Sequence, residues 1–295
     1  MASADLFVHR RTASPQAAAA WDRRQVLLNN LRTVLGRAYP RLIGLTREPS
    51  WLLFEVGLPF LTTSAFVLVY RALQAPPEYI GFVVVGGAMT AFWLNVIWMM
   101  AAQLYWEKDQ GNLELYFTAP MDMMAVLFGM AVGGMVASCL RAAVVLIVGS
   151  VVYGVHFSVD QWLPLLAVFF LTLLALYGLG MMLASLFVLW GREAWHMTQL
   201  LQEPMYFVSG LNFPVGRLGF LGAMAIALLP LAVGLDAMRQ LAFAGGTVDF
   251  QTPPPSVEVV ILVAMAVIFL VLARYCLRTM ERLARHEGRL TARWR

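Results

Sequence analysis

Six long apolar runs limit what this chain can fold into more than any other feature of its sequence. They cover residues 51–70, 80–104, 123–153, 163–190, 195–211 and 257–277. A helix needs about 20 apolar residues to cross the hydrocarbon of a bilayer. The chain is 60% hydrophobic and only 13% charged, whereas soluble domains carry about 25% charged residues. The sequence therefore predicts an all-α membrane protein with six transmembrane helices, in residues 48–278.

The basic residues predict how these helices are oriented. Seventeen of the 21 Lys and Arg residues fall in the two terminal segments and in the loops after the second and fourth runs. The loops on the opposite side hold only Arg71, Arg217 and Arg239. Positive residues accumulate on the cytosolic side of membrane proteins. We therefore expect both termini in the cytosol.

The terminal segments are predicted to lie outside the bilayer core. Residues 1–22 contain Arg10-Arg11 but no apolar signal region, and we expect a disordered cytosolic tail. In residues 23–47, Leu27, Leu31 and Leu35 share one face of an Arg-rich helix, which is typical of a helix at the membrane surface. The alternative is a helix packed on soluble protein. Residues 279–295 are expected to form a basic cytosolic tail.

The segment between the fifth and sixth runs, residues 212–256, is apolar but is broken by Pro230. We expect two short extracellular re-entrant helices here, before the last span, because proline interrupts a helix. Two simple surface helices are the alternative. Phe213, Pro214 and Pro230 are candidates for an extracellular gate.

Four polar residues inside the apolar runs are candidates for an intramembrane site: Glu55, Asn95, Arg141 and Glu203. A charge at the bilayer centre costs roughly 2.5–3.5 kcal/mol on insertion scales, so such residues often line a polar path or pair with one another. Other interpretations are that Glu55 reaches the cytosolic surface and that Arg141 forms a structural pair. For Glu203, beside Pro204, both interpretations stay open.

No catalytic or cofactor site is evident in the sequence. A phosphate-binding P-loop needs a lysine after its glycines, and the single lysine, Lys108, lies in Trp106-Glu107-Lys108-Asp109-Gln110. Cys139 and Cys276 form no metal-binding spacing. We expect that the chain is not an enzyme, binds no metal and no cofactor, and hydrolyses no ATP itself.

The loop between the second and third runs is the most informative segment. Gly111 permits a tight turn, and Leu113, Tyr116 and Phe117 then recur at helical spacing before Pro120. A short, acidic, amphipathic helix on a cytosolic loop suits the docking of a partner protein. A plain connecting turn is the alternative.

This loop resembles the signature loop of ABC-2 type permeases. The residues that carry the resemblance are Glu107, Gly111, Leu113, Glu114 and Pro120, with Asn112 where that family usually has threonine. The segments 191–196, 209–214 and 236–239 and Pro230 are also similar to that family, and the likeness runs from Arg23 to Leu277.

The resemblance implies the transmembrane subunit of an ATP-binding-cassette exporter. Such permeases pair with a second copy or a paralogue, and a separate ATPase subunit, which binds ATP and Mg²⁺, docks on the amino-terminal helix and on the loop. The substrates of the family include drugs, antibiotics, lipids and glycans. We expect a multi-pass protein in the plasma membrane of a prokaryote, in contact with lipid and not with nucleic acid. The alternatives are an ATP-independent secondary transporter or channel, and a membrane enzyme, which the missing catalytic residues disfavour.

The predicted orientation can be tested with single cysteines in a chain that lacks Cys139 and Cys276. Cysteines at Gln74 and Ser158 should react with a membrane-impermeant thiol reagent applied to intact cells, whereas one at Gln110 should react only after lysis. Labelling of position 110 in intact cells would overturn the orientation.

Overall fold

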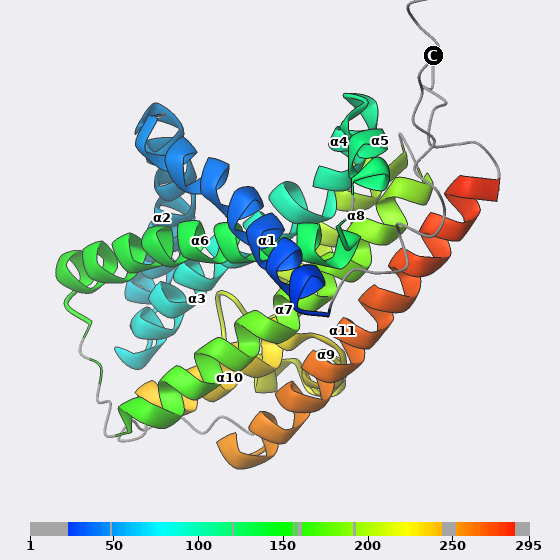
Figure 1. Cartoon of the computed structure of the whole chain (residues 1–295). Coiled ribbons are helices and arrows are strands. Elements are labelled where there is room, and N and C mark those ends of the chain that lie inside the picture. Colours follow the sequence, from blue (N-terminus) through cyan, green and yellow to red (C-terminus); the bar gives the residue numbers. More distant parts are fainter. Residues whose placement is uncertain are drawn as a thin grey trace, which may run out of the picture.

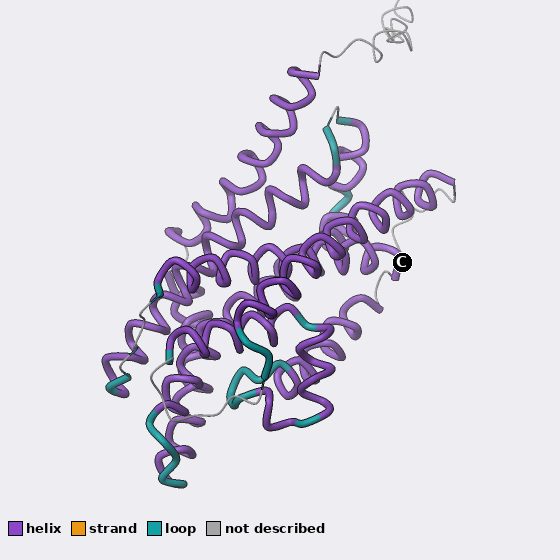
Figure 2. Tube along the Cα trace, turned by 90° about the horizontal axis from the view of Figure 1, so that it is seen from below, coloured by secondary structure: helices purple, strands orange, loops and turns teal. Residues whose placement is uncertain are grey.

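The computed structural model describes residues 23–47, 49–119, 121–155, 157, 161–190, 193–243 and 252–286. The predicted tail at residues 1–22 and Pro120 lie outside these ranges, and so do the side chains of Glu55 and Glu114. Within them every regular element is a helix (Figure 2). The elements are α1 (Arg23–Arg47), α2 (Pro49–Ala72), α3 (Glu78–Leu94), η2 (Asn95–Ala101), α4 (Gln103–Asp109), α5 (Asn112–Thr118), α6 (Met123–Tyr153), α7 (Trp162–Trp190), α8 (Glu193–Val208), η3 (Val215–Leu218), α9 (Phe220–Leu228), α10 (Pro230–Ala242) and α11 (Pro255–His286).

Four stretches of the described chain are long and apolar enough to cross a membrane. They are Glu78–Asp109, Met123–Tyr153, Trp162–Leu186 and Pro255–Leu283. A fifth arises if α9 and α10 are counted as one broken span. The apolar part of α2, Val56–Ala72, and the 16-residue α8 fall below this length. An all-helical membrane fold is thus confirmed, and the six-span layout stays a prediction.

The second predicted span is a single helical rod with a π-helical segment inside it. Helix α3 passes into η2 at Asn95, and α4 follows after Ala102. The amide of Ala102 donates to the carbonyl of Ile97, five residues earlier, at 3.3 Å. Short π-helical segments within α-helices often mark functional sites. Here the irregular segment places Asn95 in the protein interior, with 3% of its surface exposed.

Helix α1 crosses α6 at a pair of glycines (Figure 1). A Cβ atom on Gly129 would lie 2.7 Å from the carbonyl oxygen of Val34, and one on Gly133 would lie 3.0 Å from the Cα atom of Ala38. Glycines four residues apart allow two helix backbones to touch in this way. The predicted apolar face of α1 points outward instead, with Leu27 and Leu35 exposed. An exposed apolar face is what a helix at the membrane surface requires.

The break predicted in the segment before the last span is present. Helices α9 and α10 meet at an angle of 104°. Leu229 between them is extended, and Pro230 is the first residue of α10, where its missing N–H costs no hydrogen bond. Phe220 and Leu228 of α9 are exposed, whereas α10 is buried from Pro230 to Arg239. Helix α10 is therefore part of the core and not a simple surface helix.

The last helix, α11, packs mainly on α7 and runs to His286. It continues past residue 278, where the sequence predicts that the membrane domain ends. Figure 1 shows that α11 starts beside α10 and ends near the side of the molecule that carries α4 and α5.

Close packing around α3 gives a direct test of the fold. A Cβ atom on Gly86 would lie 1.6 Å from the carbonyl oxygen of Leu211. We expect Gly86→Ala to push the backbone at Leu211 away from α3. The variant should lower the free energy of unfolding by about 1–3 kcal/mol, the usual cost of overpacking. The measurement is the thermal unfolding midpoint in detergent. Gly57→Ala on α2 is the matched control, because its Cβ would meet nothing within 4 Å. Equal midpoints for the two variants would contradict the packing described.

Candidate functional site

The predicted docking loop forms a helical hairpin. Helix α4 ends at Asp109, Gln110 and Gly111 form the turn, and α5 begins at Asn112. Gly111 has φ of 79°, in the left-handed region, and the turn is closed by a hydrogen bond of 3.0 Å from its amide to the carbonyl of Lys108. Gly111 therefore makes the tight turn that the sequence predicts, with a positive φ at which a side chain would strain the backbone.

Glu107 is the centre of the hairpin and is 5% exposed. Its Oε1 accepts hydrogen bonds from Arg37 Nη2 at 2.6 Å and from Gln103 Nε2 at 3.0 Å. Its Oε2 accepts from Asn112 Nδ2 at 3.0 Å and from the Tyr116 hydroxyl at 2.9 Å. One carboxylate thus connects α1, α4 and α5. A buried carboxylate is stable in such a place only when donors and a cation satisfy it.

The Tyr116 ring strengthens the same contact. The guanidinium carbon of Arg37 lies 5.1 Å from the ring centroid, within the range of a cation–π interaction. Burial, together with the hydrogen bond to Glu107, raises the pKa of Tyr116 to about 12. The phenol therefore keeps its proton at neutral pH and remains a donor to Glu107.

Helix α1 also holds the far end of the hairpin, where α6 begins. The amide of Asp122 donates to Asn30 Oδ1 at 3.2 Å, and the Thr33 hydroxyl lies 3.7 Å from the sulfur of Met121. The Asp122 side chain caps α6 by accepting from the amide of Met124 at 2.9 Å. The hairpin is thus fixed to α1 at two places, at Glu107 in α4 and at residues 121–122 before α6.

Two large apolar side chains are exposed on the described part of the hairpin. Leu113 faces the core and is 1% exposed, whereas Leu115 on the same helix is 64% exposed and Trp106 on α4 is 40% exposed. Exposed apolar groups on a rigid element are a common feature of protein interfaces. The side chain of Glu114 and all of Pro120 lie outside the described part of the chain.

A second polar cluster lies deeper, around the π-helical segment. Asn95 Oδ1 accepts a hydrogen bond of 3.1 Å from the Tyr177 hydroxyl. Arg41 donates to the carbonyls of Met99 and Met130. Arg141 is buried on α6 and interacts electrostatically with both Arg41 and Tyr177. Asn95 and Arg141, two of the predicted intramembrane residues, therefore lie in the same cluster. The sequence did not indicate the other two members of the cluster, Tyr177 and Arg41.

The other two intramembrane candidates do not belong to this cluster. Glu203 is exposed on α8, beside Tyr206. Glu55 lies on α2, and its side chain is outside the described part.

Two of the three predicted gate residues, Phe213 and Pro214, lie in a loop that Arg239 holds in place. Arg239 is 1% exposed. Its Nη1 donates to the carbonyl oxygens of Gly210 at 2.5 Å and Phe213 at 3.2 Å. Its Nη2 donates to those of Leu211 and Phe82, both at 2.7 Å. Loop residues near Phe213 and Pro214 are thus attached to α3 and α10, while Pro230 starts α10.

Sequence reasoning does not find the arginine partners of these sites. The helical pattern places Arg37 on the polar side of α1. The sequence identifies Arg41 and Arg239 as charged residues but indicates no partner for either. The available signal is the spacing of Arg37 and Arg41, which puts two cations on one face of a helix, opposite its leucines.

Comparison with known families agrees with this architecture. A family model described as ABC-2 type transporter matches residues 40–243, which is more than half of the chain. The matched region contains the hairpin, the π-helical segment and helices α9 and α10. The comparison with curated proteins finds no match.

The Arg37–Glu107 contact can be tested by a double-mutant cycle. Arg37→Met and Glu107→Gln should each lower the thermal unfolding midpoint, and the double variant should lose less than the sum, with a coupling free energy on the order of 1 kcal/mol. Arg32→Met, at an exposed position of the same helix, should leave the midpoint unchanged. Strict additivity of the two single variants would show that the pair contributes nothing.

Proposed function

Because the chain belongs to the ABC-2 type transporter family, we propose that it is the permease subunit of an exporter driven by a separate ATPase subunit. The family match carries this proposal. Two features of the chain support it: long apolar helices that suit a bilayer, and a single lysine, Lys108, that is not in a P-loop. Nucleotide hydrolysis with Mg²⁺ is then the task of the partner chain.

The α4–α5 hairpin is the proposed docking point for that ATPase. Trp106 and Leu115 offer an exposed apolar surface, while the opposite side of the hairpin is fixed through Glu107. A contact of this kind transmits motion only if it does not yield locally. The hydrogen bonds from Arg37, Gln103, Asn112 and Tyr116 to Glu107 supply that stiffness. Motion of the hairpin would therefore be passed to α1.

From α1 the motion has a direct route into the membrane domain. Arg41, one turn beyond Arg37, donates to the carbonyl of Met99 in η2 and to that of Met130 in α6. The glycine contacts of α6 then place α1 directly on its backbone. We therefore propose that α1 and α6 shift together when the ATPase closes, and that η2 deforms in response.

The remaining features of the proposal rest on the basic residues and on the family. Both termini would lie in the cytosol, α9 and α10 would dip into the outer leaflet, and a second copy or a paralogue would complete the pathway. The transported molecule would be a drug, antibiotic, lipid or glycan. The exposed apolar face of α1 would rest on the plasma membrane of a prokaryote.

One observation favours a second candidate, an ATP-independent transporter. The 104° bend between α9 and α10 is similar to the discontinuous helices that bind substrate in secondary transporters. The two candidates differ in their energy source, so transport in vesicles with and without ATP separates them.

Gly111 provides the sharpest test of coupling. In vesicles that contain the permease and its ATPase, Gly111→Val should abolish ATP-driven transport, because a β-branched residue is strongly disfavoured at its φ of 79°. Glu114→Arg, which reverses a charge on the predicted docking helix, should do the same. Both variants should still insert into the membrane. The purified permease alone should show no ATPase activity.

The matched control is Gly154→Val. Gly154 ends α6 with φ of 69° and has open space around it. Its substitution adds similar backbone strain away from the hairpin, so transport should persist. Native transport by both hairpin variants, with the ATPase still bound, would mean that the hairpin is only a connector.

A further inference from the structure

Two carboxyl groups are buried where α10 meets the start of α11. Asp236 is 1% exposed and Glu258 is 0% exposed. Gln240 Nε2 donates to Asp236 Oδ2 at 3.0 Å and lies 3.3 Å from Glu258 Oε2, so the two groups are neighbours. Asp236 also acts electrostatically on Glu258. In Figure 1, α10 and the beginning of α11 lie at the end of the molecule opposite α4 and α5.

Among the described residues, this cluster contains more acceptors than donors. The amide nitrogen of Gln240 carries two hydrogens, yet it lies within hydrogen-bonding distance of four acceptors, since Thr252 Oγ1 and the carbonyl of Pro253 are also 3.1 Å and 3.0 Å away. Asp236 Oδ1 and Glu258 Oε1 are buried without a hydrogen-bond partner among the described residues. Buried acceptors of this kind are unusual, because each costs free energy.

The charges do not balance either if both carboxyl groups are ionised. Arg239 is the adjacent cation. Its two terminal nitrogens, Nη1 and Nη2, donate to backbone carbonyls, whereas its buried Nε has no hydrogen-bond partner among the described residues. The Tyr70 phenol on α2 also faces Arg239. Helix α9 has no charged residue, and α7 has none along its length. On α3, Glu78 adds a carboxyl group and no positive charge. Two carboxylates and one guanidinium would leave a net negative charge in the protein interior.

We propose that Asp236 and Glu258 form a proton-binding site, in which one proton is shared between Asp236 Oδ1 and Glu258 Oε1. The proton comes from water, and it gives both unpartnered oxygens a hydrogen bond. The pair then carries one negative charge, which Arg239 balances. Two carboxyl groups at close range commonly share a proton in this way. The shared proton joins α10 to α11.

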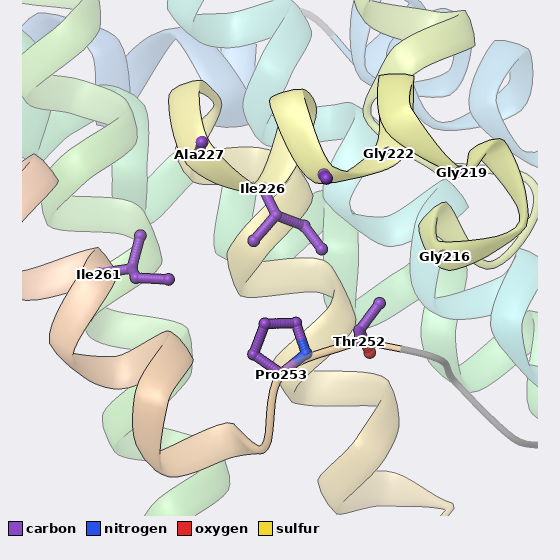
Figure 3. Close-up of a pocket in the computed structure, with 9 residues that line it drawn as sticks. Gly216, Gly219, Gly222, Ile226, Ala227, Thr252, Pro253 and Ile261 are labelled. Atoms are coloured by element: carbon purple, nitrogen blue, oxygen red, sulfur yellow. The ribbon is translucent and has the colours of Figure 1, made fainter.

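A pocket lies near the pair, on the far side of residues 252–253. It has a volume of about 470 Å³ and lies between α9, the start of α11 and residues 252–253. Figure 3 shows the side chains of Ile226 and Ile261 and the Pro253 ring directed toward the same space. Thr252 and Pro253 line the pocket and are also the acceptors beside Gln240. Thr252 and Pro253 therefore lie between the pocket and the carboxyl pair.

Loss of the proton would place two negative charges between α10 and α11. These charges repel, and the contact between the two helices would loosen. The proposed site thus makes the packing of α10, which carries Arg239 and through it the loop at Phe213, sensitive to pH. This property is independent of the ATPase and of the transported substrate.

Infrared spectroscopy of the purified full chain tests the proposal. A protonated carboxyl group gives a C=O stretching band that an ionised one lacks. At neutral pH the native chain should show a band that Glu258→Gln removes, since the remaining Asp236 is balanced by Arg239. Glu203→Gln, at an exposed position on α8, should leave the band unchanged. Absence of the band from the native chain, or its persistence in Glu258→Gln, would overturn the proposal.

Thermal unfolding supplies an independent readout. Raising the pH from roughly 6 to roughly 9, a range in which buried carboxyl groups are documented to titrate, should lower the midpoint of the native chain and of Glu203→Gln. Glu258→Gln should fold, because its amide N–H can replace the proton as donor to Asp236. Over the same rise in pH, the unfolding midpoint of Glu258→Gln should fall several-fold less than that of the native chain. Equal pH dependence in the native chain and Glu258→Gln would contradict the proposal.

A metal cation in place of the proton is distinguished in the same samples. Sodium or calcium chloride should leave the band and the midpoint unchanged relative to choline chloride at equal ionic strength. Loss of the band on addition of either metal would show that the pair binds a metal ion, and the proton site would be rejected.

Discussion

A charged group buried in the interior of this protein needs partners within the protein, because neither the packed interior nor a bilayer supplies water. This constraint explains the most ordered contacts in the structure. Glu107 receives four hydrogen bonds, Arg239 donates to four carbonyls, and Arg41 donates to two. In each case the partners come from different elements. The satisfaction of one charge thereby fixes the relative positions of several helices.

The two ends of the molecule meet this constraint in different ways. At the α4–α5 end, carboxylate and guanidinium pair directly, and each oxygen of the carboxylate receives two hydrogen bonds. At the α10 end, the terminal nitrogens of Arg239 donate to backbone carbonyls, and the neighbouring carboxyl groups are left with too few donors. The first arrangement suits an element that must transmit force without yielding. The second contains an equilibrium that the surroundings can shift.

Much of the architecture could be predicted from the sequence, because apolar runs and prolines act locally. The run at 123–153 coincides with α6, the break at Pro230 separates α9 from α10, and Gly111 has the positive φ that its place before α5 requires. What could not be predicted depends on contacts between distant segments. The π-helical segment at Asn95 has no local signal. Arg37 reaches Glu107 only because Gly129 and Gly133 let α1 lie on α6. The helical pattern of α1 alone reveals its outward leucines but not the residue to which Arg37 binds.

The glycine contact between α1 and α6 has a consequence for how such a chain can vary over evolution. With the backbones touching, α1 has a fixed rotational register, and each inserted or deleted residue would turn the remainder of the helix by about 100°. A single insertion between Val34 and Arg37 would rotate the arginine away from Glu107, or would lift Val34 off Gly129. The outward leucines can be exchanged among apolar residues at little cost, since nothing in the described part of the chain packs on them. The length of this helix should therefore change far more slowly than its sequence does.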